Sequence, residues 1–191
     1  MPVPDARTAA DLRPLWEALA EHAAPFFSEW WGEDSLPLQR RLIDGAPREL
    51  AAAADQPRTL IHNDFNPRNI AFRGEGERGR LCAFDWELAT LDLPQRDLAE
   101  LLCFVLAEDA PGELVWEYVE LHRVELERLS GRSLDREAWI RGFEVSLNQL
   151  LLSRLPLYVV YHRIRRQEFL PRVLANWRRM SRWVDQPRGS G

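Results

Sequence analysis

A short polar segment beginning at residue 62 carries several side chains that could take part in chemistry. It reads H-N-D-F-N-P-R-N and contains His62, Asp64, Asn66 and Asn69. The segment lies between two apolar runs that are typical of strands, so we expect it to be a loop that holds polar groups at the surface. If a carboxylate in such a loop binds no metal, it could accept a proton from a hydroxyl group.

A second carboxylate follows another apolar run. Asp85 comes directly after residues 81–84, and Glu87 stands two positions further on. We expect the ends of the two strands to present two carboxylates and an Asn side by side. Such a set suits a hard cation such as Mg²⁺, which takes a few oxygen ligands and leaves room for phosphate oxygens.

Three motifs resemble the catalytic segment of the protein-kinase-like superfamily, in its aminoglycoside phosphotransferase and choline kinase branch. The H-x-D-x-x-x-x-N loop of that branch is matched by His62, Asp64 and Asn69. Its D-x-D/E motif is matched by residues 85–87, and its D-L-A motif by residues 97–99. The motifs occur in the order of the family, and together they are more specific than any one of them.

The resemblance implies a phosphotransferase that moves a phosphoryl group from ATP, or another nucleoside triphosphate, to a hydroxyl of a small molecule. Asp64 would be the catalytic base, while Asn69 and Asp85 would hold Mg²⁺ against the phosphates. His62 would fix the loop through its ring. Asp97 would brace the loop by accepting backbone hydrogen bonds.

Three further residues are possible accessories in this site. Glu87 could assist the metal or hydrogen-bond the loop. Arg68 stands where the family usually has Gly, and Asn66 where relatives often have Lys or His. Arg68 could touch a phosphate or face the solvent.

The resemblance covers essentially the whole chain, but only as a C-terminal lobe. We expect this lobe over residues 1–186, with a catalytic segment at 59–100, a helical substrate subdomain at 101–186 and a disordered tail at 187–191. A complete kinase of this branch also has an N-terminal β-rich lobe with a phosphate loop and a Lys.

The first 61 residues show no sign of that second lobe. They read as helices, and all 25 basic residues of the chain are Arg, with no Lys. The missing lobe could belong to a longer form of this chain or to a separate partner chain. Alternatively, the protein is a remnant lobe that binds a small molecule or a partner protein without catalysis.

The periodicity of apolar residues predicts a mainly helical (α+β) fold with a small central β insert. Pro156 is expected to end or kink the helix that contains it. Strands are expected at residues 59–61, 69–72 and 81–84. Helices are expected at residues 11–24, 35–43, 47–54, 93–106, 112–129, from 135 to 152 or beyond, and 168–184.

Composition excludes several classes of protein. With 191 residues, 46% hydrophobic and 29% charged, the chain fits one globular domain. Two cysteines exclude a disulfide scaffold and a four-cysteine zinc site. The longest apolar run, residues 101–107, is too short to cross a bilayer, and the first residues do not read as a secretory signal. We therefore expect a cytoplasmic protein without membrane contact.

Two other features could be mistaken for binding sites. Residues 160–191 carry eight Arg and two acidic residues, but a solvated helix face explains this excess, and we expect no nucleic acid partner. Residues 74–79 match G-x-G-x-x-G, yet a strand rather than a helix is expected after them. A nucleotide loop of that kind requires a following helix, so we predict a hairpin turn.

Overall fold

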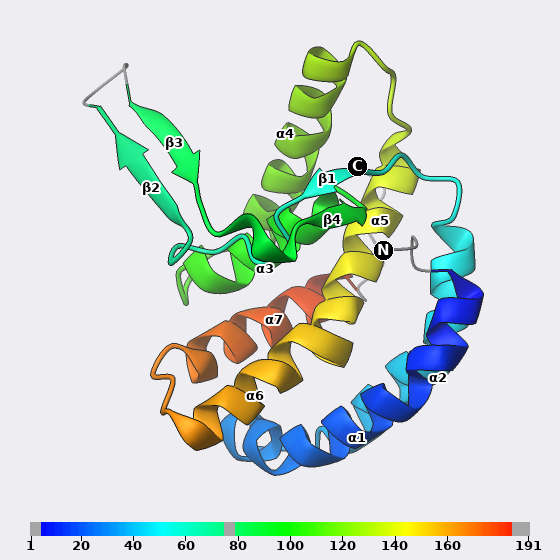
Figure 1. Cartoon of the computed structure of the whole chain (residues 1–191), viewed down its shortest axis with the longest axis vertical. Coiled ribbons are helices and arrows are strands. Elements are labelled where there is room, and N and C mark those ends of the chain that lie inside the picture. Colours follow the sequence, from blue (N-terminus) through cyan, green and yellow to red (C-terminus); the bar gives the residue numbers. More distant parts are fainter. Residues whose placement is uncertain (1–4, 75–78, 185–191) are drawn as a thin grey trace.

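The computed structural model describes residues 5–74 and 79–184. The described part is mainly helical with two small two-stranded sheets, as the sequence predicts (Figure 1). Most of the expected turn at residues 74–79 and the expected tail at 187–191 lie outside the described residues. The strands are β1 (Thr59–Ile61), β2 (Ile70–Arg73), β3 (Arg80–Ala83) and β4 (Thr90–Asp92). The α-helices are α1 (Ala6–Trp31), α2 (Leu36–Ala52), α3 (Gln95–Val105), α4 (Gly112–Ser130), α5 (Arg136–Gln149), α6 (Leu155–Ile164) and α7 (Leu170–Val184).

The first helix is longer than the sequence predicts. It was expected to end near residue 24, but α1 continues through the aromatic segment and ends only at Gly32, which has a left-handed backbone with φ 69°. Packing explains the extension. Phe27 is fully buried, and the ring of Trp31 stacks on Trp177 of α7 at 5.8 Å between centroids. Burial of the aromatic side chains therefore stabilises the helix beyond its local signals.

The second helix corrects another prediction. Two short helices separated near Gly45 and Pro47 were expected, whereas α2 is one helix that contains both residues. Ile43 and Leu50 lie on either side of the expected break, and both are buried in a cluster with Trp16 of α1. This shared apolar face stabilises the helix across two residues that disfavour it.

The two sheets hold the polar loop between them. β1 pairs antiparallel with β4, and β2 pairs antiparallel with β3. Residues 62–69 connect β1 to β2, while residues 84–89 connect β3 to β4 and include a short 3₁₀ turn, Trp86–Leu88. Both connections therefore run between the same two sheets. The β2–β3 hairpin projects from the helical body (Figure 1). β4 was not predicted.

The long helix around Pro156 is bent rather than ended. α5 runs into a π-helical segment, Leu150–Arg154, which continues directly into α6. Pro156 occupies the first turn of α6 and has no backbone N–H to donate to the preceding turn. The wider π turn accommodates this missing hydrogen bond. This segment and α6 bring Arg154 and Tyr158 into contact with the polar loop.

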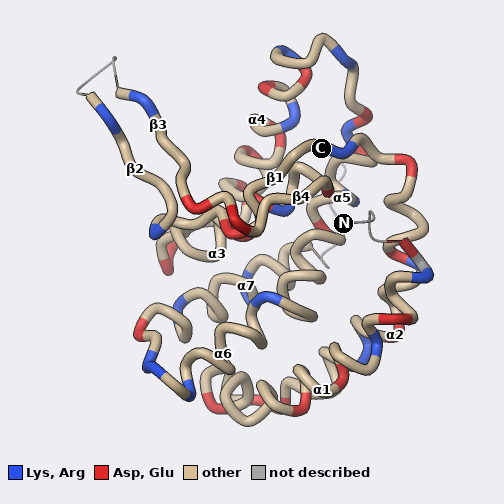
Figure 2. The backbone as a smooth tube through the Cα atoms, in the orientation of Figure 1, with Lys and Arg blue, Asp and Glu red and all other residues tan. Residues whose placement is uncertain are grey.

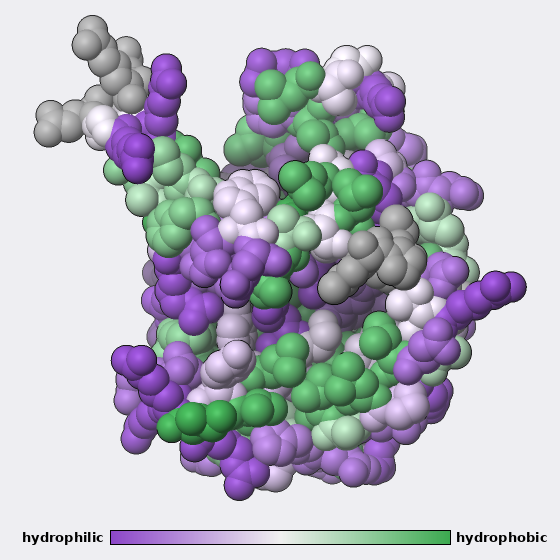
Figure 3. Space-filling view, viewed as in Figure 1, coloured by the Kyte–Doolittle hydropathy of each residue, from purple (hydrophilic) through white to green (hydrophobic). Residues whose placement is uncertain are grey.

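Apolar side chains of α1, α3, α5, α6 and α7 form the main core. Hydrophobic residues also reach the surface over α6 and the neighbouring part of α1 in the space-filling view (Figure 3). Charged residues lie mostly on the outward sides of the helices, and acidic residues gather where β3 meets the turn before β4 (Figure 2). In the described part of the chain, no helix is long and apolar enough to cross a membrane.

Candidate functional site

Asp97, in the first turn of α3, holds the start of the polar loop. Its Oδ2 accepts the backbone N–H of His62 at 2.7 Å, and its Oδ1 accepts that of Asn63 at 2.8 Å. Burial raises the pKa of Asp97, although these two backbone hydrogen bonds oppose the rise. The contacts are those that the resemblance implied for a bracing residue.

Asn63 turns the chain away from β1. Its backbone is left-handed, with φ 60°, a conformation that Asn tolerates better than most residues. The side chain is fixed at both ends, because Oδ1 accepts from Arg96 Nε at 2.8 Å and Nδ2 donates to the Leu88 carbonyl at 3.1 Å. The Asn63 carbonyl oxygen accepts a further hydrogen bond from Arg154. The turn is therefore held by α3, by the segment before β4 and by the π-helical segment.

His62 connects the loop to the end of β3. Its side chain is buried, and Nε2 lies 2.7 Å from the carbonyl oxygen of Phe84. Because a carbonyl only accepts, Nε2 must carry the hydrogen. The backbone N–H of Phe84 donates to the Asn69 carbonyl at 3.0 Å. Both backbone polar groups of Phe84 are thus hydrogen-bonded to the loop. Asp85 follows Phe84 directly and has a left-handed φ of 64°, so it lies beside the loop.

The carboxylate of Asp64 is held by donors on both oxygens. Asn69 Nδ2 donates to Oδ2 at 2.8 Å, and Asn66 Nδ2 donates to Oδ1 at 3.0 Å. The hydroxyl of Tyr158, on α6, also lies 2.8 Å from Oδ1. Burial raises the pKa of Asp64, but the hydrogen bonds and the nearby Arg154 outweigh it, and the net shift is downward. Asp64 is therefore ionised near neutral pH.

The side chains of this site fit a hard cation. The described hydrogen bonds of the Asn69 side chain all use Nδ2, which leaves Oδ1 for a ligand. Asp85 is exposed, and no hydrogen bond or ion pair from the described residues engages its carboxylate. No group of three or more His, Cys, Asp and Glu side chains in the described ranges could hold a metal. A cation here would therefore need the Asn69 oxygen and ligand oxygens as well.

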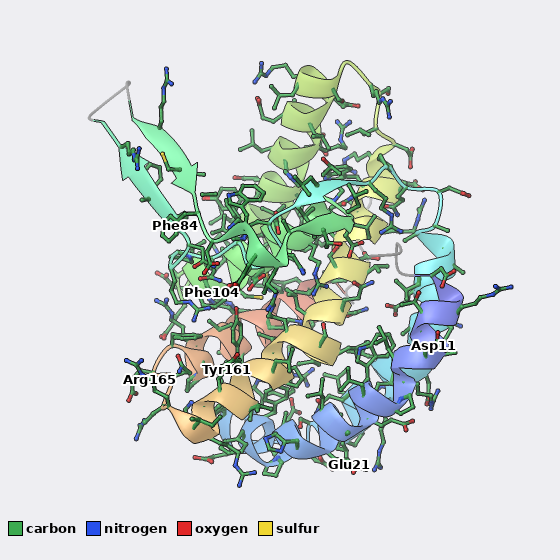
Figure 4. All side chains as sticks on the ribbon, in the orientation of Figure 1. Asp11, Glu21, Phe84, Phe104, Tyr161 and Arg165 are labelled. Atoms are coloured by element: carbon green, nitrogen blue, oxygen red, sulfur yellow. The ribbon has the colours of Figure 1, made fainter. Side chains whose placement is uncertain are left out.

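Arg68 is exposed, and its guanidinium packs over aromatic rings. Its guanidinium carbon sits 4.7 Å from the ring centroid of Phe169, 5.2 Å from that of Tyr158 and 5.4 Å from that of Phe104. It also donates to Asn66 Oδ1 at 3.0 Å. Phe104 projects from α3 on the side of the molecule that carries the loop (Figure 4). Arg68 therefore packs the loop against aromatic side chains of the helical body.

Glu87 lies on the exposed 3₁₀ turn Trp86–Leu88. The indole of Trp86 packs against the His62 ring, with 4.7 Å between centroids. The structure thus brings His62, Asp64, Asn66 and Asn69 together in one loop, with Asp97 behind it and Asp85 at its edge. Glu87 is placed on the same edge and keeps its accessory role as a prediction.

The sequence matches a family of known proteins. Residues 2–132 match the sequence model of APH, the phosphotransferase enzyme family. The chain belongs to this family. A stretch of 78 residues is also 37% identical to part of acyl-CoA dehydrogenase family member 10 of Mus musculus. That alignment covers 40% of this chain and 7% of the mouse protein, so the activity of the whole mouse protein does not transfer.

Several residues at the site of this phosphotransferase-family chain were missed by sequence reasoning. Tyr158 contacts Asp64 across 94 residues of sequence, and Arg154 contacts Asn63 across 91. Both lie beyond the matched range of the family. Glu100 lies behind them on α3 and is only 2% exposed. An acidic residue within the apolar stretch of α3 was the one available signal, since charged residues are rarely buried without a partner.

Proposed function

We propose that the protein transfers a phosphoryl group from a nucleoside triphosphate, ATP in the first instance, to a hydroxyl of a small molecule, with Asp64 as the general base. The observation that carries the proposal is the state of the Asp64 carboxylate. It is ionised, only half-buried, and fixed by hydrogen bonds from Asn66, Asn69 and Tyr158. A base so placed can accept the proton of a substrate hydroxyl as the new bond to phosphorus forms.

Asn69 and Asp85 are the residues that would hold Mg²⁺, and the ion would supply charge neutralisation on the phosphate oxygens. The chain contributes the positioning of these two residues. Asn69 donates through Nδ2 to Asp64, and its Oδ1 takes part in no described hydrogen bond. His62 fixes the carbonyl of Phe84, which precedes Asp85. Both proposed metal ligands are thus connected to the loop that carries the base.

We further propose that a second lobe completes the nucleotide site, either in a longer form of the chain or in a partner chain. The sequence contains no Lys, and no β-rich lobe is present among the described residues. Large apolar side chains are exposed on the small sheets, with Leu60, Phe72 and Leu91 each more than half exposed. Such a surface is unusual unless something covers it. The two cysteines are free, which agrees with a cytoplasmic location.

Phosphoryl transfer from γ-labelled ATP tests the proposal directly. The natural gene product, purified from its own host, is assayed with Mg²⁺ and a panel of aminoglycosides, sugars and amino alcohols. Asp64→Asn is expected to lower turnover by about 10²- to 10⁴-fold while nucleotide binding persists. Asp85→Asn is expected to abolish the Mg²⁺ dependence of nucleotide binding. Asp109→Asn, at an exposed site on another segment, serves as the matched control.

Undiminished turnover in Asp64→Asn would contradict the assigned base.

The mass of the natural gene product shows whether the second lobe belongs to the same chain or to a partner chain. A product heavier than 22.2 kDa would support a lobe in the same chain. A product of this mass that purifies with a partner would support a lobe supplied in trans. A product of this mass that purifies alone and binds no nucleotide would contradict the proposed enzyme. It would support a remnant domain that binds a small molecule or a partner protein without catalysis.

A further inference from the structure

The hydroxyl of Tyr158 lies between two carboxyl groups. Its oxygen is 2.8 Å from Asp64 Oδ1 and 2.9 Å from Glu100 Oε1. A third group, Arg68 Nη2, lies 3.1 Å from the same oxygen. Tyr158 belongs to α6, Glu100 to α3, and Asp64 to the loop between β1 and β2. Three separate parts of the fold therefore meet at one phenolic oxygen.

The hydrogens available at this oxygen do not suffice if both carboxyl groups are ionised. A tyrosine hydroxyl donates one hydrogen bond and accepts through its lone pairs. Arg68 only donates, so it uses one lone pair of the oxygen. Two carboxyl oxygens within 3 Å require two hydrogens, and Tyr158 supplies one. The second hydrogen must belong to a carboxyl group, which then donates to Tyr158.

The surroundings indicate which carboxyl group carries that hydrogen. Asp64 accepts from the amide groups of Asn66 and Asn69, which favour the ionised form. Glu100 is 2% exposed, and its Oε2 is buried without a hydrogen-bond partner in the described structure. An ionised carboxylate left in this state would be costly. A neutral Glu100 that donates to Tyr158 satisfies the oxygen at 2.9 Å.

The charges that face Glu100 do not reverse this assignment. Burial is the largest influence and raises the pKa of Glu100, Asp64 raises it further, and the arginines oppose the rise without cancelling it. The titratable and charged groups that face Glu100 are Asp64 in the loop, Arg154 in the π-helical segment, Tyr158 on α6, and Arg96 and Cys103 on its own helix.

We propose that Tyr158 and a protonated Glu100 are positioning residues that hold the carboxylate of Asp64 in place. Because Glu100 donates to the phenolic oxygen, the single hydrogen of Tyr158 is committed to Asp64. The hydrogen bond anchors the loop to α3 and α6. The catalytic consequence rests on the proposed function, in which Asp64 is the base, whereas the hydrogen-bond network itself does not.

Carbon-13 NMR titration of the Asp and Glu carboxyl groups in this chain tests the network without requiring turnover. Glu100→Gln identifies the Glu100 signal, which is expected to have the chemical shift of a protonated carboxyl group at neutral pH. Tyr158→Phe removes the hydroxyl that contacts Glu100 while keeping the ring, so the Glu100 signal is expected to move. Tyr161→Phe, on the same helix but 64% exposed (Figure 4), is expected to leave that signal unchanged. An ionised Glu100 at neutral pH, or the same Glu100 signal in a folded Tyr158→Phe variant, would overturn the proposal.

Kinetics on the completed enzyme separate this inference from the proposed function. Tyr158→Phe is expected to lower kcat by about tenfold or more, with little change in KM. Unchanged kcat in this variant would overturn the positioning role alone. Undiminished turnover in Asp64→Asn would instead contradict the proposed function, while the titration results would stand.

Discussion

Asp97 accepts the backbone N–H of Asn63, the residue whose left-handed backbone turns the chain from β1 into the polar loop. Its second oxygen accepts the neighbouring N–H of His62. One carboxylate in the first turn of α3 therefore fixes two successive peptide groups. The position of Asp64, which follows Asn63 directly, depends on this pair of bonds.

Asp97→Asn should destabilise the protein by about 1–3 kcal/mol, because an amide offers only one acceptor oxygen and leaves a partly buried N–H without a partner. The amide NH₂ would also face a backbone donor. Urea unfolding followed by circular dichroism measures the change. Asp109→Asn, at an exposed position, should stay within about 0.5 kcal/mol of the parent. Equal unfolding midpoints for the two variants would show that the paired bonds contribute little.

The polar loop was predictable from sequence because its residues lie close together along the chain. The spacing of His62, Asp64 and Asn69, together with two apolar runs, was enough to place them in one loop. Asp97 was within reach because its motif opens the next helix. Asp85 was predicted at a strand end, and the pairing of β2 with β3 places it there.

Residues that reach the site from distant helices were not predictable in this way. Tyr158 and Arg154 resemble ordinary helix residues in the sequence, and only the fold brings them to Asp64 and Asn63. The breaks expected near Gly45 and Pro47 failed for a related reason, because tertiary burial outweighed local propensity. β4 was missed because it is only three residues long, which is too short for a clear strand pattern in the sequence. Its pairing with β1 defines it as a strand.

Two glycines on helices should respond in opposite ways to the same substitution. A Cβ at Gly142 on α5 would lie 2.5 Å from Gln95 Nε2 and would also overlap Gln56. Gly142→Ala should therefore destabilise the protein by about 1–3 kcal/mol through overpacking. A Cβ at Gly45 on α2 would meet its nearest neighbour, Glu49, at an ordinary 3.5 Å. Gly45→Ala should stabilise by about 0.5–1 kcal/mol, since Ala favours the helix.

Thermal and urea unfolding of the two variants, measured side by side, check this pair. The substitution is identical and both sites are helical, so differences in propensity largely cancel. A stabilised Gly142→Ala variant would show that the glutamines move aside at little cost. A destabilised Gly45→Ala variant would contradict the account of α2 as one helix.

His122, on α4, should make the stability of the protein depend on pH on the acidic side. Burial lowers its pKa to about 4, and its ring lies 5.3 Å from that of Trp139, between centroids. In the unfolded chain the pKa of His is about 6.5. A lowered pKa means that the unfolded state binds the proton more readily. The contribution of His122 is therefore fully present above about pH 6.5 and is lost as the pH falls toward about 4.

Two measurements check this prediction. Proton NMR of the four His rings should show one, assigned by its absence in His122→Gln, that titrates near pH 4. Urea unfolding of the parent and of His122→Gln is measured at a series of pH values. The free energy of unfolding of the parent, relative to that of the variant, should decrease as the pH falls. The variant cancels the contribution of all other titrating groups, because they are common to both proteins. A ring that titrates near 6.5, or a difference that does not change with pH, would contradict the burial of a neutral His122.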